Sequence, residues 1–236
     1  MSLVATLRRR TVLLVMLVVF ALGAALLGVG LSHQPTTAAA QPVAQDHHEG
    51  TDVTVTTPSR LAFHDQMRKL WEDHITWTRL AIVTFAAGTQ GFETTATRLL
   101  QNQDDIGNAF RPFYGDAAAD RLTSLLHDHI TIAVEILQAA KAGDTDAVNK
   151  ASARWYANAN DIADFWASIN PRFWPDAVMR ADMKGHLDQT LAEAVDELGG
   201  NFAAGVAEYE VVHQHILNMA DMLSTGIIGQ FPKKFR

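Results

Sequence analysis

The sequence predicts an all-α protein: an up-and-down antiparallel bundle of about six helices with an internal helix-pair repeat, preceded by an N-terminal membrane helix. Three observations carry this prediction. Apolar residues recur at helical spacing in six segments after about residue 58, no alternating strand pattern interrupts them, and residues 11–31 form an uncharged, largely apolar run. The 236 residues, of which 48% are hydrophobic and 19% charged, suffice for a buried core and exclude a disordered chain.

The first forty residues predict export. Residues 1–11 read as a cytoplasmic basic flank containing Arg8, Arg9 and Arg10, and residues 12–31 as a transmembrane anchor or a signal-peptide h-region. About twenty apolar residues suit a spanning helix better than an h-region of about 7–15. We therefore expect a single-pass membrane protein with its N-terminus inside and its C-terminal domain extracytoplasmic. The alternative is a protein secreted after cleavage near Ala40, because three alanines end at that position.

Residues 32–58 read as a flexible linker, rich in Thr, Ala, Pro and Gln, that ends where the bundle domain of residues 59–231 begins. The linker contains His47 and His48. These two could chelate a surface metal, but a solvated polar segment is the simpler interpretation. Prolines and glycines divide the bundle domain into helices. Gly88 and Gly143 are expected to end the first and third helices, and Pro112 the second. The six expected helices cover residues 59–88, 95–111, 116–142, 145–169, 175–198 and 201–228.

Composition removes several classes of function. The chain has no Cys, which excludes disulfides, thiolate metal sites, Cys nucleophiles and iron–sulfur clusters. Its formal net charge is −7, and residues 41–236 carry −10 because the first forty residues contain three Arg and no acid. Such an acidic surface argues against a nucleic-acid partner, since phosphates attract Lys and Arg. The expected partner is the membrane, through the N-terminal helix, and any further partner in the membrane or envelope is left open.

An internal repeat links the middle helices. The pattern R-x-x-x-N-x-x-D-I occurs at Arg98 and again at Arg154, 56 residues later. His129-Ile130 then matches His186-Leu187, so we place the repeat copies at about 98–150 and 154–210. His74-Ile75, 55 residues before His129, resembles the end of a third, truncated copy. Repeats of this length predict equivalent units, here pseudo-symmetric parts of one bundle.

Four helices each place one histidine on the apolar face, close to the helix midpoint: His74, His129, His186 and His215. In an antiparallel bundle the helix midpoints share a layer, so these four imidazoles are expected to converge. A single inward histidine is more often a hydrogen-bonded core residue than a ligand, but four in one layer favour a functional centre.

Two acids are expected to join the histidines. Asp105 and Asp161 hold equivalent positions in the two copies, on or beside the buried stripe. A buried carboxylate needs a cation, a metal or several donors, and imidazole with carboxylate is the ligand set of transition metals. We therefore predict a metal site formed by the four histidines with Asp105 and Asp161. Zn or Cu is favoured, Fe or Mn is possible, and no organic cofactor is expected.

Several segments resemble a family of small, functionally uncharacterised exported bacterial all-helical proteins. They are Leu70–Arg79, Asn102–Phe110, Phe113–Gly115, Arg154–Asn160 and His215–Leu223, and the resemblance covers roughly residues 68–225. Some members carry transferred labels such as glycosyltransferase or acetylglutamate kinase. Those labels imply strands and phosphate-binding loops that this sequence does not contain. The resemblance implies an all-helical fold and supplies no mechanism.

The sequence thus predicts a membrane-tethered extracytoplasmic bundle that binds a transition metal for binding, storage or sensing. Two alternatives stay open: a metal-dependent enzyme that uses the same centre, and a non-catalytic structural or interaction module with a polar core. No catalytic motif such as G-x-S-x-G or H-E-x-x-H is present.

Overall fold

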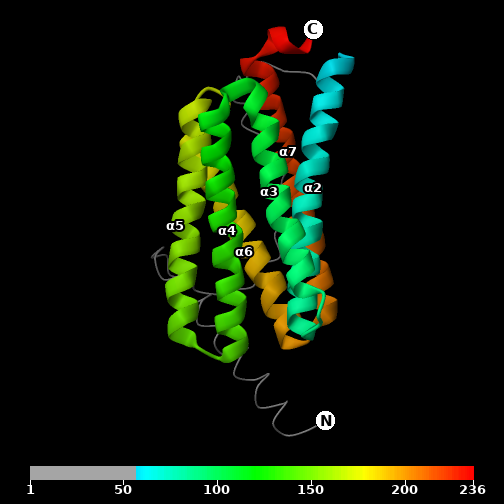
Figure 1. The fold of residues 1–236 in the computed structure, drawn as a ribbon, viewed down its shortest axis with the longest axis vertical. Helices are drawn as coiled ribbons and strands as arrows, with labels where there is room; N and C mark the ends of the chain where they lie inside the picture. The colour runs from blue at the N-terminus through cyan, green and yellow to red at the C-terminus, as the bar shows by residue number, and fades with distance from the viewer. Residues whose placement is uncertain (1–56) are drawn as a thin grey trace, which may run out of the picture.

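The computed structural model describes residues 57–236, so the predicted anchor and nearly all of the predicted linker lie outside the described residues. Within 57–236 the chain is helical throughout and contains no strand. The helices, labelled as in Figure 1, are α2 (Pro58–Ala87), α3 (Phe92–Tyr114), α4 (Asp116–Ala142), α5 (Thr145–Ile169), α6 (Asp176–Gly199) and α7 (Phe202–Gln230), followed by the short 3₁₀ helix η1 (Pro232–Phe235).

The six helices form a closed antiparallel ring (Figure 1). Each helix packs against its neighbours in sequence, and α7 closes the ring against α2. Short connections place consecutive helices side by side in opposite directions. α2 also touches α4 and α6 across the interior. The predicted helical bundle is therefore confirmed for the described part of the chain.

One end of the bundle is closed by aromatic side chains. The rings of Phe63 in α2, Phe113 in α3 and Phe235 in η1 pack together with centroids 5.0–5.4 Å apart, and Phe113 stacks on Phe235. Trp174, in the α5–α6 connection, is fully buried and contacts Phe110 of α3. The domain thus extends past residue 231, its predicted end, because Phe235 belongs to the core.

Helix boundaries follow the predicted punctuation except at Pro112. Gly88 and Gly143 end α2 and α4 with φ of 68° and 76°, a left-handed conformation that costs glycine no steric clash. The prediction that the second helix ends before Pro112 is wrong, because α3 runs on to Tyr114. The proline removes only one backbone hydrogen bond in the last turn, and the side chains that follow it pack into the aromatic end.

None of the helices within residues 57–236 combines the length and apolarity that a membrane span requires.

Candidate functional site

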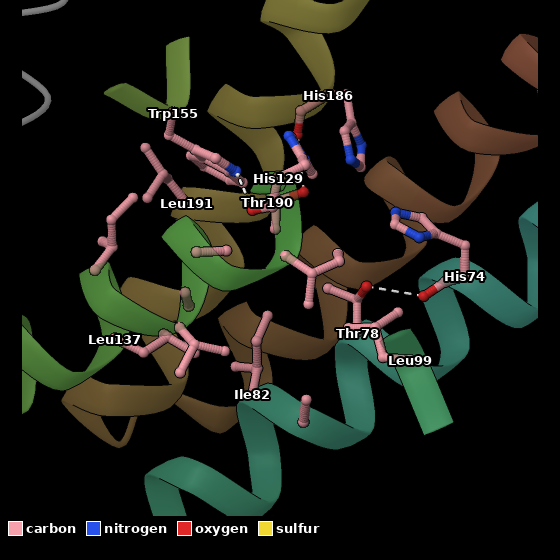
Figure 2. Close-up of a pocket in the computed structure, with 16 residues that line it drawn as sticks. His74, Thr78, Ile82, Leu99, His129, Leu137, Trp155, His186, Thr190 and Leu191 are labelled. Atoms are coloured by element: carbon pink, nitrogen blue, oxygen red, sulfur yellow. Dashed lines mark hydrogen bonds between the residues drawn. The ribbon is translucent and has the colours of Figure 1, made fainter. Parts of the chain in front are cut away.

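The four predicted histidines meet around His186. The ring centroids of His74 and His129 lie 5.8 and 6.0 Å from that of His186, and the centroid of His215 lies 6.3 Å from it. His74, His129 and His186 are at most 3% exposed, and Figure 2 shows these three imidazoles gathered at one side of a pocket. The convergence expected from their mid-helix positions is confirmed.

Two helix pairs support their histidines with the same hydrogen bond. The Asn102 side-chain amide in α3 donates to the Leu70 carbonyl in α2, and that of Asn158 in α5 donates to the Leu125 carbonyl in α4, both at 3.0 Å. Each carbonyl lies four residues before the histidine of its helix. The two buried asparagines are the Asn of the repeat pattern, so the repeat is visible as a repeated contact.

The third helix pair makes this contact with a histidine. The Nε2–H of His215 in α7 donates to the Asp182 carbonyl in α6 at 3.0 Å, and Asp182 lies four residues before His186. His215 therefore holds the place of an asparagine in a third copy. By this contact the described helices pair as three corresponding hairpins, α2–α3, α4–α5 and α6–α7. The copies predicted at 98–150 and 154–210 divide the same repeat one helix later.

The outward ring nitrogens have different partners in the three copies. His129 Nδ1–H donates to Asn158 Oδ1 at 3.0 Å, which leaves the lone pair on Nε2. The Gln103 amide donates to His74 Nδ1 at 3.2 Å, which places the proton of His74 on Nε2. His186 Nδ1 is buried and has no hydrogen-bond partner within residues 57–236.

Burial keeps the three central imidazoles neutral. Desolvation lowers the pKa of His74 to about 3, with a further contribution from His129. Desolvation likewise lowers the pKa of His129 to about 4, and that of His186 well below its usual value. At neutral pH the site therefore presents uncharged imidazoles, which is the form that ligates metals.

The prediction that Asp105 and Asp161 lie on the buried stripe is wrong. Both residues are exposed, and the Asp105 carboxylate lies 3.6 Å from the Arg98 guanidinium. Each acid precedes a fully buried isoleucine, Ile106 or Ile162, and one residue of an α-helix turns by about 100°. That rotation carries the two carboxylates away from the histidines.

Three other histidines pair with acids outside the cluster. His127 contacts Asp104 at 3.0 Å, His213 contacts Glu72 at 3.1 Å, and His64 contacts Asp221 at 2.9 Å. His127 and His213 therefore point away from the core histidines.

A buried charged group lies between α2, α6 and α7. The Arg79 guanidinium contacts Glu193 at 3.1 Å and Glu197 at 2.5 Å, and both carboxylates are almost fully buried. Two acids share one cation, and desolvation raises the pKa of Glu193 to about 7 against the opposing effect of Arg79. Arg79 also lies over the ring of Tyr209. In the sequence, the position of Glu193 two helical turns after His186 is only a weak signal for this group.

Sequence reasoning missed Gln103, the partner of His74. The sequence feature that could have revealed Gln103 is its position next to Asn102, on a helix whose other inward residues are apolar. Within residues 57–236, no three His, Cys, Asp or Glu side chains are arranged so as to enclose a metal ion as they stand.

No family model matches the chain, and no curated protein or solved structure matches it either.

Proposed function

We propose that the protein binds a transition metal among His74, His129 and His186, with Zn or Cu favoured and Fe or Mn possible. The observation that carries the proposal is the convergence of three buried, neutral imidazoles from equivalent positions of three hairpins. Imidazole nitrogen is a ligand for each of these metals. Three histidines with a fourth position open form the donor set of catalytic rather than structural zinc sites.

The residues behind the imidazoles fit this role. A metal-bound histidine commonly donates its other N–H to an oxygen, which fixes the tautomer and the ring orientation. Asn158 accepts this bond from His129. Gln103 would do the same for His74 if its amide turned over, because its Oε1 is buried and has no partner in the described chain. His215 takes the corresponding position behind His186, where its ring lies nearly parallel to that of His186 at a centroid distance of 6.3 Å and makes no hydrogen bond to it. We therefore assign His215 to orienting that ring by packing rather than to ligation.

Metal binding requires a small closure of the rings. Two imidazoles on one zinc ion, with Zn–N of about 2.0–2.1 Å, have centroids about 5 Å apart. The observed separations of 5.8 and 6.0 Å exceed this by roughly 1 Å. Rotation about χ2, which is broad for histidine, reorients the ring nitrogens but leaves the centroids nearly in place, so the approach itself requires changes of χ1 or small shifts of the helices.

The test is the metal content of the untagged full chain, extracted in mild detergent and measured by inductively coupled plasma mass spectrometry. A His33→Gln/His47→Gln/His48→Gln background removes the competing linker histidines. We expect about one metal ion per chain in this background, and loss of that ion in His186→Gln. The matched control, His127→Gln, changes a histidine that is outside the cluster and should retain the metal.

Equal metal content in His186→Gln and His127→Gln would overturn the proposal. A chain that binds no metal in any variant would favour the second candidate, a structural or interaction module. The asparagine–carbonyl bonds between paired helices support that candidate, because a buried polar contact penalises any shift of helix register. A metal-dependent enzyme would need metal first, so it is tested only if the ion is found.

We further propose that this bundle is held outside the cytoplasm by the N-terminal segment, for which the sequence pattern is the support. Protease added to intact spheroplasts should degrade the bundle and spare a membrane-bound fragment. Recovery of the protein in the culture medium with Gln41 as its first residue would show the cleaved alternative.

A further inference from the structure

A cavity of about 50 Å³ lies beside the three central histidines (Figure 2). His74, His129 and His186 line one side of it. Its other lining residues are nearly all aliphatic, and they include Ile82, Leu137 and Ala194, which pack together eight residues beyond the respective histidines. The cavity is thus bounded by the same three equivalent hairpins that supply the imidazoles.

The polar groups that line the cavity are already paired. The Thr78 hydroxyl donates to the His74 carbonyl at 2.8 Å, and the Thr190 hydroxyl donates to the His186 carbonyl at 2.8 Å. The Trp155 indole N–H donates to the His129 carbonyl at 3.0 Å. Each of these three donors also lines the cavity. These bonds use every hydrogen-bond donor of the three side chains, and the surface that faces the cavity is almost wholly apolar.

We infer that the cavity binds a neutral, apolar molecule of two or three heavy atoms, the class to which dioxygen belongs. A cavity of about 50 Å³ exceeds the roughly 10–15 Å³ that one water needs, but a stable water also needs two to four polar partners. Apolar cavities of about 150 Å³ stay dry and bind benzene, so this smaller one suits a guest with fewer heavy atoms or a single xenon atom.

The inference deepens the proposed function, and it rests on that function in one respect. A metal held by three imidazoles that border the cavity would present its open position to the guest. The cavity itself and its apolar lining do not depend on a metal, so the guest can be tested with the metal-free chain.

The probe is xenon, with the methyl signals of the metal-free full chain in detergent recorded by NMR at increasing xenon pressure. We expect the methyl groups of Ile82, Leu99 and Leu137 to shift with pressure. Ala194→Val adds two methyl groups to the cavity wall and should reduce the response at least tenfold. Ala118→Val places the same side chain in α4 away from the cavity and should leave the response unchanged.

A second variant guards against misfolding of Ala194→Val. Leu137→Ala enlarges the cavity, so it should increase the xenon response at the remaining methyl groups. Absence of any pressure-dependent shift at the cavity methyls of the unsubstituted chain would overturn the inference. Equal responses of Ala194→Val and Ala118→Val would overturn it as well.

The two proposals fail separately. Xenon binding in a chain that takes up no metal would retain the apolar cavity and reject the metal centre. One metal ion per chain without a xenon response would retain the metal centre and reject the cavity as a guest site.

Discussion

Asn158 of α5 and His215 of α7 hold the same place in two equivalent hairpins, but they make different hydrogen bonds in the polar core. Asn158 is 6% exposed and uses both ends of its amide, donating to the Leu125 carbonyl and accepting from His129. His215 makes only the first kind of contact, to the Asp182 carbonyl. Its side chain is 19% exposed and lies 3.5 Å from the Asp182 carboxylate.

This difference separates a closed polar pair from one that reaches the surface. In α4–α5 the hydrogen bonds end inside the protein. In α6–α7 the hydrogen bond joins the Asp182 carbonyl to the partly exposed His215, and His186 Nδ1 is left without a partner in the described chain. A further departure follows seven residues beyond His186, where Glu193 stands at the position of two apolar residues, Ala81 and Ile136. The third hairpin has therefore acquired polar groups that the scaffold itself does not require.

Lowering the pH should give the largest effect, because it acts on all three buried histidines. Their folded-state pKa values, about 3 for His74, about 4 for His129 and well lowered for His186, lie below the unfolded value of about 6.5. The free energy of unfolding is therefore unaffected by these histidines well above pH 6.5 and falls as the pH is lowered below it, because only the unfolded chain then binds protons on them. Urea unfolding of the metal-free chain should show a loss of about 3–6 kcal/mol between pH 6.5 and 5.

A single-residue check belongs to that experiment. His129→Gln should reduce the pH dependence by about one proton, and His127→Gln, at a half-buried position outside the cluster, is the matched control. Stability that stays constant between pH 6.5 and 5 would mean that the three imidazoles are not held neutral in the folded state.

Asn158→Leu tests the closed pair and should lower the free energy of unfolding by about 2–4 kcal/mol. It leaves the buried N–H of His129 without its acceptor, and an unsatisfied buried donor costs about 1–3 kcal/mol in addition to the lost contact. Urea denaturation at pH 7 measures the change. Asn160→Leu, an exposed position on the same helix, should stay within about 0.5 kcal/mol of the parent chain. Equal stability of the two variants would remove the distinction between the hairpins.

His215→Asn gives the third hairpin the residue that the other two carry. The amide can still donate to the Asp182 carbonyl, so the bundle should remain folded. If His215 orients His186 for metal binding, affinity should fall about 10–100-fold. Competition with a chromophoric chelator measures the affinity, with His213→Asn as the control on the same helix. Unchanged affinity would show that the departure in the third hairpin does not serve the centre.

Glu193→Gln should give the smallest effect, a gain of about 1 kcal/mol at pH 8. The folded-state pKa of Glu193 is about 7, above its unfolded value near 4.5. Its charged form therefore destabilises the fold above pH 7, and this penalty disappears as the pH falls toward 4.5. Gln removes the penalty at the cost of the charged contact with Arg79, which still holds Glu197. Thermal unfolding at pH 8 and pH 5 should show the gain only at pH 8, and a loss at pH 8 would contradict this account.

The sequence by itself determined the number and nearly all boundaries of the helices in the described chain. Helical spacing, glycine ends and short connections are local properties, so they can be read without knowing which helices meet. The inward placement of His74, His129 and His186 also followed from spacing, because each stands within a continuous apolar stripe. The asparagine of the repeat pattern was visible too, although its role as the partner of a carbonyl was not.

Only the tertiary structure decided which polar groups belong to the site. Residue spacing gives the direction of a helical side chain only approximately, and neighbouring residues differ by a rotation of about 100°. Asp105 and Asp161 therefore lie outside the core although they stand next to its apolar stripe, and Gln103 lies inside. The equivalence of His215 with two asparagines depends on how the neighbouring helices α6 and α7 pack. The pairing of Arg79 with Glu193 and its position over Tyr209 depend on contacts of α2 with α6 and α7, helices far apart in the chain. Those contacts are fixed when α7 closes the ring against α2, which no local pattern encodes.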